Sequence, residues 1–155
     1  IGWFATGDVG HTDENGYLKI TDRKKDLIVN AAGKNIAPQR IETILKTIPA
    51  VSQAVVFGDK NKHLVALLTL DERQAMELAQ ERGWQYEKYP DLAKSKEMHQ
   101  YLKNEVNAKR GELAEYEHIK QFSVLDRDLS IDSGELTATM KIKAWCCSRK
   151  IRRQN

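Results

Sequence analysis

VSQAVVFGDKNKHLVALLTL, residues 51–70, contains the longest apolar-rich run of the chain, His63–Leu70. Val51–Phe57 and His63–Leu70 are rich in Val and Leu, which favours β-strands. Gly58–Lys62 between them is polar and begins with glycine, which is typical of a turn. The centre of the chain therefore predicts two consecutive strands.

Helices are predicted on both sides of this pair. Pro38 suits the first turn of a helix, where a missing N–H costs nothing, and Pro49 ends that helix. Its apolar residues recur at i, i+3, i+4 and i+7, namely Ile41, Ile44, Leu45 and Ile48. After the strands, Asp71 is the expected N-cap of a helix over Arg73–Arg82.

The second half of the chain predicts one more long helix and one more strand. The helix spans Ser95–Asn107, and a short helical turn at Leu113–His118 precedes a strand at Ile119–Leu125. Tyr86–Leu92 is expected to be irregular around Pro90. This order of elements predicts an α+β fold, a small antiparallel sheet with flanking helices.

The N-terminal part predicts short strands and turns. Asp13–Gly16 contains Asn-Gly, which readily forms a tight turn, and it leads into a strand at Tyr17–Ile20. The charged residues Asp22–Asp26 separate that strand from Leu27–Val29, so we expect these two strands to form a hairpin. Ala32–Asn35 is expected to be a loop.

The charge of the chain is unevenly distributed. The 155 residues carry a formal charge of +3, but Thr137–Asn155 holds six basic residues and no acid. The rest has 19 basic against 22 acidic residues, so a chain-wide basic surface for nucleic acid is not indicated.

The remaining composition excludes several classes of protein. No apolar run approaches the roughly 20 residues of a membrane helix. The two cysteines, Cys146 and Cys147, are adjacent, which disfavours a mutual disulfide and favours a reducing compartment. The four histidines are scattered, so no metal site is expected. We therefore expect a cytoplasmic protein, with peripheral membrane contact as an option for the basic tail.

Three polar clusters could carry chemistry, and each has a structural alternative. Thr6–Asp8 presents a carboxylate that could bind a sugar diol, or simply a capping aspartate. Asp22–Asp26 offers a guanidinium for ribose or phosphate oxygens, or a solvated hairpin turn. Gly134–Lys141 ends in an ammonium suited to a transferring phosphoryl group, or in a solvated lysine.

The order of three motifs resembles the adenylate-forming acyl-CoA synthetases. Gly2–Gly10 is similar to their G-W-x-x-T-G-D-x-G motif, and Gly16–Asp26 to their G-x-L-x-I-x-D-R-x-K-D hinge motif. Asn30–Glu42 resembles the G-x-x-I-x-P-x-x-I-E stretch that follows. Gly134–Lys143 is similar to the G-E-L-T-P-T-x-K-x-K ending of the long-chain fatty-acid branch, with Ala138 in place of proline.

The resemblance implies a role for each matching residue. Asp8 would accept hydrogen bonds from the ribose hydroxyls of ATP or AMP, and Arg23 would assist at that ribose. Lys25 matches the hinge about which the small domain swings between the two half-reactions. Lys141 would enter the site to stabilise charge during adenylation. The loop of Gly33, Lys34 and Asn35 would approach the pantetheine arm of coenzyme A.

The resemblance also implies a division of the chain. Residues 1–22 would end the N-terminal adenylation domain, residues 23–143 would form the mobile C-terminal domain, and residues 144–155 form an atypical basic tail. ATP, coenzyme A and a fatty acid are the implied substrates. Mg²⁺ is implied with ATP, bound mainly by the missing N-terminal domain. That domain also holds the phosphate loop and acyl tunnel, so the chain alone is expected to be inactive.

Two alternatives remain open at this point. The parent enzyme could be another adenylate-forming ligase, with a medium-chain or aryl substrate or a carrier-protein acceptor. The chain could also be a non-catalytic fragment that docks on a partner ligase, which exposed apolar surface at the missing domain's position would favour.

Overall fold

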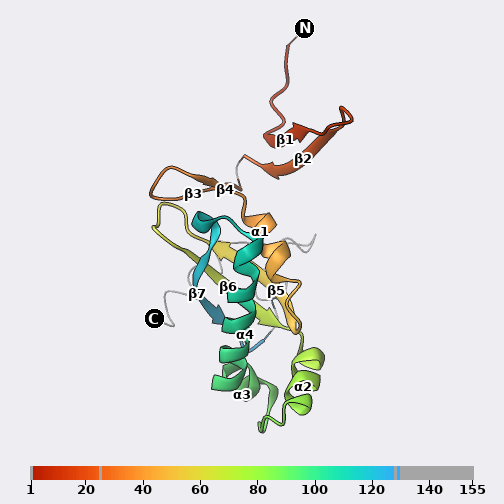
Figure 1. Ribbon diagram of the computed structural model, residues 1–155, viewed down its shortest axis with the longest axis vertical. Helices are drawn as coiled ribbons and strands as arrows, with labels where there is room; N and C mark the ends of the chain where they lie inside the picture. Colours follow the sequence, from red (N-terminus) through yellow and green to blue (C-terminus); the bar gives the residue numbers. More distant parts are fainter. Residues whose placement is uncertain (1, 25, 128, 130–155) are drawn as a thin grey trace.

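The main sheet of the molecule has three strands (Figure 1). The computed structural model describes residues 2–24, 26–127 and 129. The strands are β5 (Val51–Phe57), β6 (Leu64–Leu70) and β7 (Ile119–Val124), in that spatial order. β5 and β6 are antiparallel, with Val55 opposite Leu67, which confirms the strand pair predicted at the centre of the chain. β7 runs parallel to β6, so this sheet is mixed rather than wholly antiparallel.

Two helices, α1 (Pro38–Leu45) and α4 (Lys96–Ala108), cover one face of the sheet, and α2 (Glu72–Glu81) lies past the ends of the strands (Figure 1). All three are close to the predicted ranges. Asp71 caps α2 by accepting a hydrogen bond from the N–H of Gln74 at 2.9 Å, as predicted. Ser95 caps α4 in the same way, through the N–H of Met98 at 3.1 Å. The α+β class is therefore confirmed.

The core lies between these helices and the sheet. Ile41 and Leu45 of α1, Leu68 of β6 and Met98 and Leu102 of α4 are all completely buried. Each side chain of this size contributes roughly 1.5–3 kcal/mol when it leaves water. This cluster fixes how α1 and α4 sit on the sheet.

The opposite face of the sheet holds a smaller cluster. Val55 of β5 and Leu67 of β6 point to it, and Leu125 and Leu129 cover them from the segment after β7. The N–H of Leu125 also donates to the carbonyl of Leu68 at 2.9 Å. The chain that leaves β7 is therefore anchored on the back of the sheet as far as Leu129.

The segment before α4 differs from the prediction. Residues 89–94 form a short helix, α3 (Tyr89–Lys94), where the sequence suggested irregular structure around Pro90. Proline lies in the first turn of α3, where its missing N–H is not needed, so it begins this helix instead of breaking one. The helical turn predicted before β7 is confirmed as a 3₁₀ turn, η2 (Glu115–Glu117).

The predicted N-terminal hairpin is wrong in its pairing. β2 (Leu18–Arg23) pairs with β1 (Asp8–Thr12), and β3 (Ile28–Val29) pairs with β4 (Asn35–Ile36). The turn at Asp13–Gly16 is where it was predicted, and it joins β1 to β2. The charged cluster after β2 consequently connects two hairpins. Figure 1 shows the β1–β2 hairpin projecting from one end of the molecule, opposite α2 and α3.

Within the part of the chain that the structure describes, no helix has the length and apolar character needed to cross a membrane.

Candidate functional site

The β1–β2 hairpin brings two of the predicted nucleotide-binding residues together. Asp8 begins β1, Arg23 ends β2, and the two are directly opposite each other in the ladder. The N–H of Asp8 donates to Oγ1 of Thr6 at 3.2 Å, and the N–H of Lys24 donates to the carbonyl of Gly7 at 2.7 Å. Residues from two separate motifs thus become neighbours at the open end of one hairpin.

Glycines allow this hairpin to form. Gly7, immediately before Asp8, has a φ of +79°, a conformation that residues with a Cβ rarely adopt. A Cβ at Gly10 would lie 2.6 Å from the carbonyl oxygen of Lys19 on the facing strand. Gly10, the last glycine of the G-D-x-G segment, is therefore required because the backbones of β1 and β2 approach closely at this point. A register irregularity falls at the same point, between Val9 and Gly10.

The predicted coenzyme A-side loop connects β3 to β4 and is organised by Asn30. Oδ1 of Asn30 accepts hydrogen bonds from the N–H groups of Ala32 and Lys34, at 3.0 and 2.9 Å. Gly33 takes a φ of +73° at the tip, and its N–H donates to the carbonyl of Asn30 at 2.9 Å. Gly33, Lys34 and Asn35 are all exposed. The loop is thus a defined turn on the surface, available to a ligand.

A second loop braces the first. The turn between β5 and β6 lies against β3, because the N–H of Lys60 donates to the carbonyl of Val29 at 2.8 Å and the N–H of Ala31 donates to the carbonyl of Asn61 at 3.1 Å. Oδ1 of Asp59 also accepts a hydrogen bond from the N–H of Val29 at 3.3 Å. These bonds tie the β3–β4 loop to the main sheet.

Sequence reasoning missed the residues that organise this region. Asn30 and Asp59 were not singled out. For Asn30 the sequence does contain a signal, since an asparagine two residues before Ala32 and four before Lys34 is typical of an Asx turn. Glu42, the last residue of the P-x-x-I-E segment, was also overlooked as a structural group. Its Oε1 accepts a hydrogen bond from the N–H of Val56 at 2.9 Å, so it joins α1 to β5.

Two predicted residues cannot be placed. Lys25 and Lys141 lie outside the described residues. Just after β7, the carboxylate of Asp126 forms an exposed ion pair with Lys94 at 2.6 Å. The hydrogen bond from Lys94 is the main cause that holds the pKa of Asp126 below its ordinary value, and the same bond raises the pKa of Lys94.

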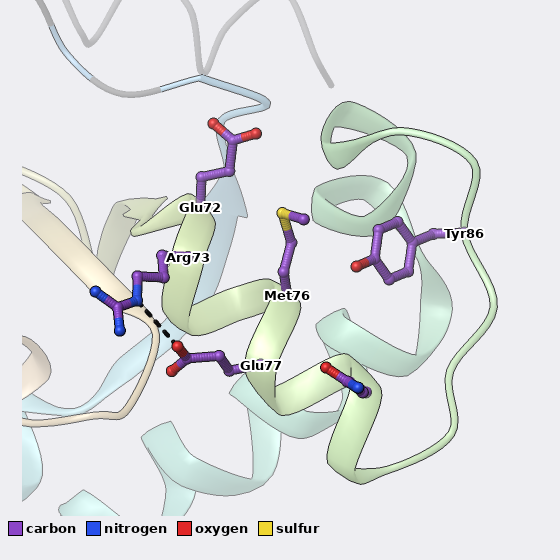
Figure 2. A pocket seen from close by; sticks show the side chains of 6 residues that line it. Glu72, Arg73, Met76, Glu77 and Tyr86 are labelled. Carbon is purple, nitrogen blue, oxygen red and sulfur yellow. Dashed lines mark hydrogen bonds and ion pairs between the residues drawn. The ribbon is translucent and has the colours of Figure 1, made fainter.

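A groove beside α2 lies apart from Asp8, Arg23 and the β3–β4 loop. It has a volume of about 490 Å³ and lies at the end of the molecule opposite the β1–β2 hairpin (Figures 1 and 2). Figure 2 shows Met76 and Tyr86 facing each other across it, with the ion pair of Arg73 and Glu77, 3.0 Å long, on one side. None of the sequence-predicted site residues that the structure describes lines it.

No group of three or more His, Cys, Asp or Glu side chains in residues 2–24, 26–127 and 129 is arranged to hold a metal ion.

The molecule has two hairpins that lead into a small mixed sheet with helices on one face. This fold is that of domains found in adenylate-forming enzymes. The adenylation domain of a carboxylate reductase from Mycobacterium chelonae shares this fold with a TM-score of 0.73, over 97% of this chain and 22% of that one, at 23% identity. The O-succinylbenzoate coenzyme A synthetase of Bacillus subtilis, solved with ATP and a magnesium ion, is 31% identical with a TM-score of 0.53, over 91% of this chain and 23% of that chain.

The sequence comparison narrows the class to a family. Residues 25–108 match the family described as AMP-binding enzyme, C-terminal domain. A long-chain-fatty-acid–CoA ligase of Mycobacterium tuberculosis, FadD15, is 40% identical in an alignment 156 positions long that covers 96% of this chain and 25% of that protein. The chain belongs to the family of AMP-binding enzyme C-terminal domains, and it spans about a quarter of the length of this relative.

Proposed function

We propose that the chain is the mobile C-terminal portion of a long-chain fatty-acid–CoA ligase. The observation that carries this proposal is the 40% identity to such a ligase across 96% of the chain. The ligase would first join the fatty-acid carboxylate to the α-phosphorus of ATP, releasing pyrophosphate. The thiol of coenzyme A would then attack the acyl carbonyl, lose its proton and release AMP, leaving the thioester.

The described residues support specific roles in these steps. Asp8 and Arg23, opposite each other at the end of the β1–β2 hairpin, are proposed to hold the ribose, since a carboxylate accepts bonds from a diol and a guanidinium donates directional ones. The exposed loop of Gly33, Lys34 and Asn35 is proposed to contact pantetheine.

Lys25 is proposed as the hinge and Lys141 as the cation that stabilises charge in adenylation; both proposals rest on their places in the motifs. We also propose that residues 1–22 belong to the preceding adenylation domain, residues 23–143 to the mobile domain, and residues 144–155 to a basic tail. Mg²⁺ would accompany ATP and be held by parts of the ligase beyond this chain.

The experiment that tests the proposal separates the two half-reactions in the full-length ligase that contains this chain. Lys141→Ala is expected to abolish adenylation while leaving thioester formation from supplied acyl-adenylate, because only the first step develops charge at the phosphoryl group. Lys103→Ala, on the exposed face of α4, is the matched control and should leave both steps unchanged. Near-normal rates of both steps in Lys141→Ala would contradict the assignment of this lysine.

One observation is compatible with a second candidate, a non-catalytic fragment that docks on a ligase, as well as with the first. Large apolar side chains are exposed on the N-terminal segment and the β1–β2 hairpin, namely Trp3, Phe4, Tyr17, Leu18 and Ile20. Such a surface requires a covering partner in either case. An assay of the purified chain with ATP, palmitate and coenzyme A tests the expectation that the chain alone is inactive, and sustained thioester formation would refute it.

A further inference from the structure

The groove beside α2 has an apolar floor that is open to solvent. Met76 points into it from α2 with 39% of its surface exposed, and the half-buried ring of Tyr86 faces it from the segment before α3 (Figure 2). The thioether of methionine adapts to the shape of an inserted group, because its side chain has several rotatable bonds and a polarizable sulfur. The floor therefore suits a large apolar or aromatic side chain.

The helix that forms one wall of the groove is acidic. α2 and its N-cap, Asp71–Glu81, contain four acidic residues and one basic residue, a net charge of −3. The one basic residue, Arg73, is paired with Glu77 at 3.0 Å. Glu72, by contrast, has no ion pair with any residue in the part of the chain that the structure describes. The groove thus fits a partner that combines positive charge with an apolar anchor.

The basic tail, residues 144–155, has this chemistry, although it lies outside the described residues. Trp145 is followed within eight residues by four cations, and the tail has no acidic residue. Tryptophan and arginine are the side chains that most often dominate the binding energy of an interface. The cations are Arg149, Lys150, Arg152 and Arg153.

The last described residue lies near the groove. Leu129 packs in the same cluster as Leu67 on the back of the sheet, and Leu67 precedes Glu72 by five residues, a path of about 18 Å or less. The 14 residues 130–143 can span up to about 50 Å when extended. The tail therefore reaches the groove of its own molecule, and this tether raises its effective concentration there.

We propose that residues 144–155 dock in the groove beside α2, with the indole of Trp145 between Met76 and Tyr86 and the cations of the tail along acidic α2. Docking removes the indole and the exposed part of Met76 from water, and it brings four positive charges to a helix segment of net charge −3. This inference stands apart from the proposed function, since the groove lies at the end of the molecule opposite the β1–β2 hairpin.

The test is NMR of the full chain, labelled with ¹³C at the methionine methyl groups. The chain has three methionines, and Met98, completely buried in α4, is the internal reference. We expect nuclear Overhauser effects between the Met76 methyl group and the indole of Trp145. In Trp145→Ala these effects should vanish and the Met76 signal should shift, because the ring current of the indole is removed, while the Met98 signal stays in place. Trp3→Ala, which removes an exposed tryptophan of the N-terminal segment, is the matched control and should leave the Met76 signal unchanged.

Charge reversal in the tail tests the electrostatic part of the proposal without altering the groove. Arg152→Glu/Arg153→Glu is expected to move the Met76 signal toward its position in Trp145→Ala, because the tail then loses its net positive charge. Lys19→Glu/Lys103→Glu makes the same change of charge at two exposed positions elsewhere and should have no such effect. A rise in salt concentration should act in the same direction as reversal of the tail charges. A Met76 signal that responds neither to salt nor to this reversal would overturn the electrostatic fit.

Three further results would overturn the proposal. An identical Met76 signal in Trp145→Ala and the unaltered chain would show that the tail does not occupy the groove. A tryptophan-dependent Met76 signal that disappears on dilution would assign the groove to the tail of a second copy. Binding of the chain to vesicles of phosphatidylcholine with phosphatidylglycerol, lost in Arg152→Glu/Arg153→Glu but without any effect of Trp145→Ala on Met76, would assign the tail to a lipid surface instead.

Discussion

Asn30 shows how one side chain can determine the shape of a functional loop. Its Oδ1 accepts two backbone N–H groups, from Ala32 and Lys34, and so replaces the ladder bonds that a tighter turn would make. This amide oxygen adds two hydrogen bonds to the backbone bonds that close the loop between Asn30 and Gly33 and between Asn30 and Lys34.

We expect Asn30→Ala to destabilise the domain by about 1–2 kcal/mol, because two N–H groups at an exposed site lose their side-chain acceptor and bind water instead. Asn30→Asp should cost less than half as much, since the carboxylate retains the acceptor. Urea unfolding of the two variants and the wild type measures the difference. Equal stability of Asn30→Ala and the wild type would show that water replaces the amide oxygen without penalty.

The candidate site residues within the motifs were easier to predict than the residues that hold the neighbouring loop in place. The motif resemblance singled out Asp8 and Arg23 from two separate stretches, and the structure places them opposite each other. Asn30 was missed although its hydrogen bonds are local, whereas Asp59 was missed because the N–H group that it binds lies thirty residues away. A one-dimensional pattern does not contain such long-range pairs.

At the scale of elements, the β1–β2 hairpin depends on close contact between its strands. A Cβ at position 10 would come within 2.6 Å of the backbone oxygen of Lys19, which cannot move without opening the ladder. We therefore expect Gly10→Ala to break the pairing near Asp8 and Arg23, at a cost of about 1–3 kcal/mol to the hairpin. Faster amide exchange confined to β1 and β2 would show this.

Gly2→Ala is the control for this prediction, since nothing lies within 4 Å of a Cβ built at Gly2. Normal amide exchange rates throughout β1 and β2 in Gly10→Ala would contradict the prediction, because the paired strands would then accommodate the added Cβ.

The link between α3 and the end of β7 should respond to pH. The hydrogen bond from Lys94 lowers the pKa of Asp126, so its stabilising effect is present above about pH 4 and is lost as the pH falls through the lowered pKa. Because the pKa of Lys94 is raised, its contribution to stability is present below about pH 10.5 and is lost as the pH rises through the raised pKa. We expect Lys94→Met to move the pKa of Asp126 back toward its ordinary value.

An NMR titration of the Asp126 carboxylate measures this pKa directly. Lys103→Met, on the exposed face of α4, should leave the titration unchanged. Identical midpoints in Lys94→Met and the wild type would contradict the ion pair in solution, where such exposed groups are screened by salt.

The elements that the sequence predicted well are those whose own residues carry the signal. β5, β6, α1, α2 and α4 follow from apolar periodicity and capping residues, and all five are present near the expected bounds. β1 was not predicted because Asp8–Thr12 has almost no apolar residues, and it is a strand only because β2 pairs with it. The parallel pairing of β7 could not be predicted, since no short turn connects it to β6.

For the molecule as a whole, the buried core and the proposed ribose-binding residues Asp8 and Arg23 lie in different parts. Among the side chains that the structure describes, the buried residues of the main core run from Ile28 to Ile119, and none of them belongs to the β1–β2 hairpin. The hairpin instead exposes Trp3, Phe4 and Tyr17. A surface of this kind is consistent with a segment that belongs to a preceding domain, as proposed.

We therefore expect removal of residues 1–24 to change the free energy of unfolding of the remaining chain by less than about 1 kcal/mol, because no buried core residue is lost. Leu68→Ala, which empties a completely buried position in β6, should cost about 2–5 kcal/mol in the same urea experiment and calibrates it. The truncated chain should also bind less of a dye that reports exposed apolar surface, since Trp3, Phe4, Tyr17, Leu18 and Ile20 are all removed. A truncated chain as unstable as Leu68→Ala would mean that the hairpin packs on the core in solution. The boundary proposed after residue 22 would then have to move toward the N-terminus.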